Sequence, residues 1–362
     1  MLLGKVQTGD TSSDKKRAVF YYYANKCYDY GGSYNKLFLK AGVRMMDKLN
    51  KRLTKLMPIL TPLSLVLGVI FEDIGAQLGF LVAWLFAFMT FAGSLSLDFQ
   101  ALKVFTRYPY MILLTIVGLH VIMPLWAYLV STFLFHDELL TFGFILSVAV
   151  PTGVTSFIWV SISRGNKALC LSIILIDTLL APLVMPAIVH IVVGKAIDID
   201  MSSLIVDLVW MVVLPSVLGM LLNEYTHGRI ENTLGQKLAP FSKLALFSIV
   251  FINSSVIAPY VREMSWELVH IIVVVFFIAV SGYILWLLLG HFIWRDPTIV
   301  STLVFTGGMR NIAIGVVIAS SYFPPKVGMP VVFGMLFQQI IASQFSRIVE
   351  KYRQRMTPAD NT

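Results

Sequence analysis

The feature that most constrains this chain is a series of apolar runs, each long enough to cross a lipid bilayer, which recur from Leu56 almost to the C-terminus. An α-helix rises about 1.5 Å per residue, so about 20 residues cross a hydrocarbon layer of about 30 Å. Charged residues make up only 13% of the sequence, about half of the share in a soluble domain. The sequence therefore predicts an all-α polytopic membrane protein.

Ten membrane spans are predicted from these runs. They lie near residues 56–71, 78–97, 109–135, 139–163, 168–193, 203–222, 238–259, 267–293, 298–322 and 327–348. We expect one membrane domain over 45–350, with one half over 56–193 and a second half over 203–348. A cytoplasmic tail over 351–362 follows.

Residues 1–44 differ in composition from the rest of the chain. They are rich in Tyr, Lys, Gly and Asn and show no sustained helical period. Two interpretations stay open: a disordered cytoplasmic extension, or a segment that precedes a true translation start at Met45 or Met46. Peptides from 1–44 in natively expressed protein would exclude the second.

The Lys and Arg residues between the spans predict the orientation, because cytoplasmic loops carry an excess of them. With the N-terminus inside, the inside loops and tail hold most of these residues, namely Lys103, Arg107, Arg164, Lys167, Arg229, Lys237, Arg295, Arg347, Lys351, Arg353 and Arg355. The outside loops hold only Lys195, Arg262 and Lys326. We therefore expect an inner (plasma) membrane protein with both termini in the cytoplasm. The net charge of +8 is then explained by the Lys and Arg residues of the cytoplasmic loops and tail, so no nucleic-acid partner is expected.

Two short signatures recur about 150 residues apart and indicate an internal repeat. Residues 62–68 are echoed by 215–219, and Pro151-Thr152-Gly153 is echoed by Thr306-Gly307-Gly308. Each copy holds five spans, an odd number, so the copies lie inverted in the membrane. Helix breaks at matching positions of inverted repeats are typical of transporter binding sites. We predict helix breaks at Pro151, Gly153, Gly307 and Gly308. The alternative is that these residues only kink their helices, which neighbouring helices in a membrane tolerate.

Several segments together resemble the bile acid:sodium symporter family over roughly 45–350. They are Phe305–Gly315, Tyr322–Pro325, Gly334–Gln339, Pro151–Gly153, Arg164–Asn166 and Leu179–Pro186. The resemblance implies a panel of spans 1, 2, 6 and 7 and a core of spans 3–5 and 8–10, in which the broken spans 4 and 9 cross. It implies transport of organic anions such as bile acids, steroid conjugates or small carboxylates, often with two sodium ions.

The sequence departs from that family at the sodium-binding positions. The family's Glu and Gln of span 9 align with Thr306 and Arg310, and its Asn of span 4 aligns with Phe157. Its hydroxyl ligands of span 5 align with Cys170 and Ile174, and a Gln of span 3 aligns with His120; only Ser156 is retained. We therefore expect no sodium coupling through the usual sites and predict no metal ligands or cofactor.

Arg310 is the most informative residue, because a charge at membrane depth is costly unless it is paired or serves an ion path. Its guanidinium replaces a sodium ion, grips a substrate carboxylate or sulfonate, or forms a structural pair. Asp177, in the middle of span 5, is the predicted partner of an Asp177–Arg310 ion pair. His120 either carries a coupling proton or is a core histidine bonded to a backbone carbonyl.

The remaining candidate substrate or ion ligands are polar residues near the breaks or facing them: Thr152, Thr155, Ser156, Thr306, Asn311, Gln338, Gln339 and Asn253. The leading interpretation is a secondary transporter of an organic anion that works by alternating access, without a required protein partner. A gated anion channel and a sodium symporter with a rearranged ion site stay as alternatives. An enzyme is disfavoured, since neither a His-Glu-x-x-His nor a Gly-x-Ser-x-Gly motif is present.

Overall fold

A computed structural model describes residues 46–356 except 47, 51, 55, 58, 98, 194–199 and 264. The two interpretations of residues 1–44 and the end of the predicted tail lie outside the described residues. Residues from Arg52 onward form one unit, to which all the contacts below belong. Its residues are helical almost throughout, and in the described part of the chain the backbone pairs as β-structure only at an isolated bridge between Thr152 and Arg310.

The described helices begin with Lys48–Thr54 and Ile59–Ile70, and from there they follow the predicted spans closely. In order they are α2 (Glu72–Gln77), α3 (Leu81–Ser94), η1 (Phe99–Lys103), α4 (Val104–Arg107), α5 (Pro109–Val117), η2 (Gly118–Ile122), α6 (Met123–Phe135), α7 (Glu138–Ala149), α8 (Ser156–Ile162), α9 (Lys167–Val193), α10 (Met201–Leu208), η3 (Val209–Val213), α11 (Leu214–Tyr225), η4 (Glu231–Gly235), α12 (Gln236–Val256), α13 (Ala258–Arg262), α14 (Trp266–Ile293), α15 (Pro297–Gly308), α16 (Ile312–Tyr322) and α17 (Pro325–Met356).

Within the described residues, six helices are long and apolar enough to cross a membrane, and two bent helix pairs bring the number to eight. Two further pairs, α7 with α8 and α15 with α16, are interrupted helices whose halves are too short to span alone. Counting each interrupted pair as one span gives the ten spans that the sequence predicts. The protein is an all-α polytopic membrane protein.

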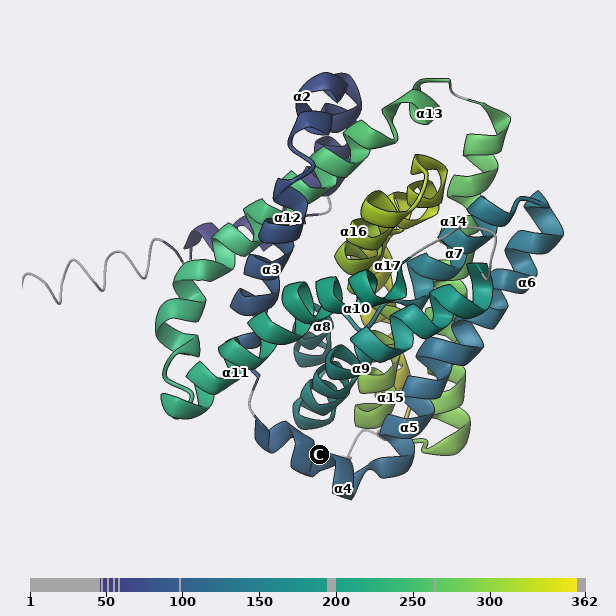
Figure 1. The fold of residues 1–362 in the computed structure, drawn as a ribbon. Helices are drawn as coiled ribbons and strands as arrows, with labels where there is room; N and C mark the ends of the chain where they lie inside the picture. The colour runs from purple at the N-terminus through teal and green to yellow at the C-terminus, as the bar shows by residue number, and fades with distance from the viewer. Residues whose placement is uncertain are drawn as a thin grey trace, which may run out of the picture. The chain divides into compact units, whose positions relative to one another are not determined.

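The helices associate in two groups (Figure 1). In one group α3 packs against α11 and α12, and α2 packs against α12. In the other, α14 packs against α15 and α17, while α7 packs against α6 and α17. These groups correspond to the panel and the core that the resemblance implies. The interrupted helices both belong to the core.

The third span contains a π-helical turn, η2, between α5 and α6. Such turns widen a helix locally and are frequent at functional sites. A Cβ atom on Gly118, the first residue of η2, would lie 2.4 Å from the ring of Trp286 on α14. A glycine is therefore needed here for α14 to pack against the third span, and η2 carries the buried His120 in this packed region.

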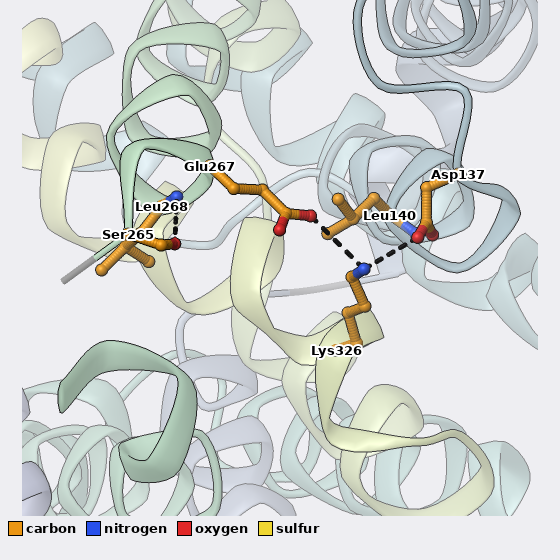
Figure 2. A network of polar contacts seen from close by, with 6 residues as sticks. All are labelled: Asp137, Leu140, Ser265, Glu267, Leu268 and Lys326. Atoms are coloured by element: carbon orange, nitrogen blue, oxygen red, sulfur yellow. Dashed lines mark hydrogen bonds and ion pairs between the residues drawn. The ribbon is translucent and has the colours of Figure 1, made fainter. Parts of the chain in front are cut away.

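Ion pairs join helix ends that the sequence places on one side of the membrane (Figure 2). The Lys326 ammonium lies 2.8 Å from Asp137 and 3.3 Å from Glu267, so it links the N-terminal ends of α7, α14 and α17. Asp137 also caps α7 by accepting the Leu140 amide. Burial alone would raise the pKa of Asp137, but the hydrogen bonds from Lys326 and Leu140 outweigh it and hold the pKa below its ordinary value.

Candidate functional site: the helix crossing

The two interrupted helices meet at their breaks, which we call the crossing (residues 150–155 and 309–311). The first break lies between α7 and α8 and contains the predicted Pro151 and Gly153. The second falls later than predicted, because Gly307 and Gly308 are still helical and α15 ends at Gly308. The prediction of a break at these two glycines is therefore wrong; the chain becomes extended at Met309.

The glycines of α15 have a different role, which is to let aromatic side chains of α14 approach the backbone. A Cβ atom on Gly307 would lie 2.2 Å from the Trp286 ring, and one on Gly308 would lie 2.6 Å from the Tyr283 ring. Trp286 and Tyr283 are both fully buried. The glycine pair therefore fixes the packing of α14 against α15 directly before the break.

Each break satisfies backbone groups of the other. The Gly153 amide donates to the Met309 carbonyl at 3.1 Å, and the Asn311 amide donates to the Pro151 carbonyl at 2.7 Å. The Thr152 hydroxyl donates to the Thr306 carbonyl at 3.0 Å. Since unpaired backbone groups are costly at membrane depth, this exchange stabilises two breaks that neither helix would tolerate alone.

Asp177 lies on α9 beside the first break and has both carboxylate oxygens engaged. Its Oδ2 accepts the Thr152 amide at 2.7 Å, and its Oδ1 lies 2.5 Å from His120 Nε2. Its side chain is completely buried. The predicted Asp177–Arg310 ion pair is therefore wrong, because His120 and the Thr152 amide take the positions that the guanidinium would need. The alternative interpretation, in which His120 bonds to a backbone carbonyl, is also wrong, because its Nε2 pairs with the Asp177 carboxylate.

Arg310 is 5% exposed and lies in the second break. Its guanidinium makes no hydrogen bond or ion pair with any residue that the structure describes, and its Nη1 atom is fully buried without a partner. Asp177 and Tyr283 lie near enough to influence its charge, but no hydrogen bond or ion pair among the described residues joins either of them to the guanidinium. Among the described Asp, Glu, His, Lys and Arg residues, only His120, Asp177 and Arg310 are buried.

A small cavity of about 40 Å³ lies beside Arg310, and we call it the Arg310 cavity. Its polar wall is formed by Arg310 with Ser147, Tyr283 and Gln338, and most of the remaining wall is apolar and comes from α6, α7 and α14. Tyr283 Oη and Gln338 Oε1 are buried and, like Arg310 Nη1, have no partner among the described residues. The cavity thus gathers three polar side chains that lack a protein partner.

The residues that the resemblance aligns with the family's sodium positions offer few free oxygen ligands. Thr306 Oγ1 donates to the Thr302 carbonyl within its own helix, and Ser156 Oγ lies 3.8 Å from the thiol of Cys170. A hard cation needs several oxygen ligands, usually with a carboxylate. The nearby carboxylate is Asp177, whose oxygens are engaged, and Arg310 adds a positive charge to the same region.

The other predicted ligands divide between the crossing and its surroundings. Gln338 lines the Arg310 cavity, whereas Gln339 accepts the Trp159 indole N–H at 3.1 Å. Asn311 contributes its backbone to the crossing, and Thr155 precedes α8 without capping it. Asn253 bonds to the Ile249 carbonyl of its own helix α12. Tyr283 and Trp286, which pack against the glycines of α15, are not among the predicted residues, although their three-residue spacing places them on one face of span 8.

Comparison with known proteins agrees with the family resemblance seen in the sequence. Residues 83–287 match the family described as "Sodium Bile acid symporter family". The chain is 43% identical to the "Uncharacterized protein YbaS" of Bacillus subtilis (strain 168) over 82% of its own length and 97% of that relative. It is 23% identical to the "Uncharacterized sodium-dependent transporter YocS" of the same organism, over 78% of its own length and 90% of that relative. It is 28% identical to the "Probable sodium/metabolite cotransporter BASS1, chloroplastic" of Oryza sativa subsp. japonica, over 56% of its own length and 49% of that relative.

Proposed function

Because this chain belongs to the sodium bile acid symporter family, we propose that it is a secondary transporter of an organic anion that works by alternating access, with Arg310 as the fixed cation of its binding region. That it is a transporter and not an enzyme follows from the family and from the names of its relatives. The substrate class, the mechanism and the coupling are the parts proposed here.

One observation carries the proposal: the buried guanidinium of Arg310 at the crossing has no contacting counterion among the described residues. Burying an unpaired charge is costly, and the cost falls when an anion binds beside it. Asp177 balances the charge of Arg310 overall, yet its own oxygens are occupied. A substrate carboxylate supplies the missing contact, and the N-terminal end of α16 directly after the break also favours negative charge.

The two helix groups support alternating access as the proposed mechanism. The core carries the crossing, and the panel packs against it through α10 with α9 and through α12 with α16. A hydrogen bond of 2.5 Å from the Tyr322 hydroxyl at the end of α16 to Asp207 on α10 holds the groups together. We propose that core and panel rock against each other and that this bond breaks when the binding region opens on that side.

We propose that transport is coupled to protons rather than to sodium at the usual positions. His120 and Asp177 form a buried pair, and Arg310 is the other buried charged residue among those described. With a neutral His120, Asp177 and Arg310 cancel. An added carboxylate is then balanced by one proton on His120, so binding of the two is linked. An inward proton gradient should therefore drive uptake, and His120→Gln should remove that dependence.

The proposed orientation places the ion pairs of Lys326 and of Arg262 on the outer side of the inner (plasma) membrane. Arg262 lies 2.9 Å from Glu72, so loops that the charge pattern assigns to one side do meet. At the predicted inner side, Arg353 of α17 donates to the Ser163 and Arg164 carbonyls. Fusions of a cytoplasm-active reporter and a periplasm-active reporter to the C-terminus test this orientation, and activity of the second alone would contradict it.

Uptake into proteoliposomes across a panel of labelled organic anions, with sodium or potassium and at two pH values, tests the function. We expect saturable uptake that is stimulated by unlabelled substrate on the opposite side and is independent of sodium. Non-saturable flux at conductive rates would favour the anion channel. Strict sodium dependence would favour the symporter with a rearranged ion site, which the name of the sodium-dependent relative keeps as the main alternative.

A further inference from the structure

The helical segment that connects the panel to the core in the first half of the chain runs in a direction of its own. This segment, η1 with α4 (Phe99–Arg107), is bent by 72° relative to α3, the helix that precedes it. Because α3 belongs to a membrane span, a helix at this angle to it runs close to the membrane plane. The Ser172 hydroxyl donates to the Ala101 carbonyl and holds the segment against the first turns of α9. Figure 1 shows α4 at the lower edge of the fold, beside α5. We call Phe99–Arg107 the surface helix.

The surface helix has an apolar and a charged side. Ala101, Val104 and the following Tyr108 are spaced as on one face of a helix and are buried or half-buried. Lys103 and Arg107, four residues apart, share another face and are exposed. A helix that lies in the plane of a membrane surface typically has such an apolar face and a polar face rich in Lys and Arg.

Aromatic side chains place this helix at the depth of the lipid headgroups. Phe105 is 44% exposed, and Tyr110, at the beginning of α5, is 82% exposed. Exposed aromatic rings of membrane proteins gather at the boundary between headgroups and acyl chains. The Arg107 guanidinium lies 5.5 Å from the centre of the Tyr108 ring, which holds its charge beside these rings.

The positive charge of the surface helix is not neutralised within the described part of the chain. Lys103 and Arg107 form no ion pair with any residue that the structure describes. In the sequence Asp98 directly precedes the helix, but no further acidic residue follows until Asp137. Two exposed cations on one face are therefore available to a negatively charged partner.

The corresponding connection in the second half of the chain differs in this respect. There α13 (Ala258–Arg262) joins the panel helix α12 to the core helix α14. Its Arg262 lies 2.9 Å from the Glu72 carboxylate and donates to the Val69 carbonyl at 2.7 Å. The charge of that connection is used inside the protein, so the free charge of the surface helix is not a general property of the two connections.

We propose that the surface helix binds acidic phospholipids of the leaflet in which it lies. Lys103 and Arg107 contact the phosphate groups, while Phe105 and Tyr110 insert at the boundary with the acyl chains. Apolar rings beside the cations favour a lipid over a soluble anion, because a soluble anion leaves the rings without a partner. The inference concerns the surrounding bilayer and not the transported substrate, and it holds whichever side of the membrane the helix faces.

The test measures thermal stabilisation of the purified full-length protein in neutral-detergent micelles that contain increasing fractions of dioleoyl phosphatidylglycerol or dioleoyl phosphatidylcholine. We expect saturable stabilisation by phosphatidylglycerol, weaker at high salt, and little by phosphatidylcholine. In the double variant Lys103→Gln/Arg107→Gln, the half-saturating fraction of phosphatidylglycerol should rise about thirtyfold, at about fivefold for each lost charge. Both side chains are exposed and unpaired, so the melting temperature without added lipid should not change.

Two further variants separate lipid binding from a general effect of charge. Lys103→Arg/Arg107→Lys keeps both cations and should bind phosphatidylglycerol like the wild type. Arg229→Gln/Lys237→Gln removes the same charge from another exposed loop, in which Glu224 and Glu231 lie nearby in the sequence, and should also bind like the wild type.

Four results would overturn the proposal. They are equal stabilisation by the two lipids, wild-type binding by Lys103→Gln/Arg107→Gln, an equal loss in Arg229→Gln/Lys237→Gln, and stabilisation by water-soluble glycerol 3-phosphate as strong as that by the lipid. The last result would assign the two cations to a soluble phosphate compound. None of these results bears on whether Arg310 binds a transported anion, because the readout is lipid binding and not uptake.

Discussion

The two sides of the crossing differ in how completely their polar groups are satisfied. On the side of α9, the Asp177 carboxylate bonds to His120 and to the Thr152 amide. On the side of α14 and α17, Arg310, Tyr283 and Gln338 border a cavity without bonding to one another. A satisfied polar network fixes a structure, and a partly satisfied one requires a further partner. We therefore propose that the first side holds the crossing together and that the second binds the substrate.

The largest expected effect follows from removing the charge on the satisfied side. Asp177→Asn keeps an acceptor for the Thr152 amide but leaves Arg310 without compensating charge, so the free energy of unfolding should fall by about 3–5 kcal/mol. Unfolding in mixed micelles measures this. The double variant Asp177→Asn/Arg310→Gln, which removes both charges, should recover much of the loss. A double variant no more stable than Asp177→Asn alone would show that the two charges do not compensate each other.

On the side of α14 and α17, removing the buried charge of Arg310 should affect transport more than stability. Arg310→Gln removes a buried charge that has no contacting partner, so we expect stability at or above the wild-type value and no anion uptake. Arg229→Gln, at an exposed position, is the matched control and should transport normally. A destabilisation as large as that of Asp177→Asn would mean that Arg310 is a structural residue, and the contrast between the two sides would fail.

The glycine pair of α15 allows the binding side to be disturbed by packing alone. A methyl group on Gly307 or Gly308 collides with Trp286 or Tyr283, so Gly307→Ala and Gly308→Ala should each cost about 1–3 kcal/mol through overpacking. Gly308→Ala should also weaken anion binding, since it moves Tyr283. The control Gly93→Ala adds a methyl group with its nearest neighbour at 3.5 Å and should be tolerated. Equal effects at all three positions would refute this packing argument.

The smallest effect is expected far from the crossing, in the ion pairs of Lys326 (Figure 2). Because these side chains are partly exposed, Lys326→Met should cost no more than about 1 kcal/mol at neutral pH. The pKa of Asp137 is lowered in the folded protein, so its stabilising contribution is present above the unfolded-state pKa and is lost as the pH falls through the folded-state value. The difference between wild type and variant should therefore shrink below about pH 4. A difference that persists under acid would exclude Asp137 as its source.

Much of the fold could be predicted from the sequence, because span lengths and hydropathy depend on local composition. The spans and the first break, at Pro151 and Gly153, follow from those rules. The second break was misplaced because glycine signals both helix breaking and close packing, and only the position of Trp286 and Tyr283 distinguishes the two.

The site was predictable as a set of residues but not as a set of bonds. Arg310, Asp177 and His120 stand out because they are charged or titratable at membrane depth. Their pairing depends on the depth and rotation of three separate helices, including the π-turn at His120, which spacing along the chain does not encode. Tyr283, which lines the cavity, was missed because an aromatic residue in an apolar span has no signal that separates a cavity wall from ordinary packing.

The most direct test of the central claim is the initial rate of labelled small-carboxylate uptake into proteoliposomes, measured for wild type and Arg310→Gln with sodium present or replaced by potassium. If Arg310 is the fixed cation of the binding region, wild-type uptake is saturable and unchanged by the replacement, and the variant is inactive in both salts. Wild-type uptake that requires sodium, or an Arg310→Gln variant that transports at the wild-type rate, would contradict the claim.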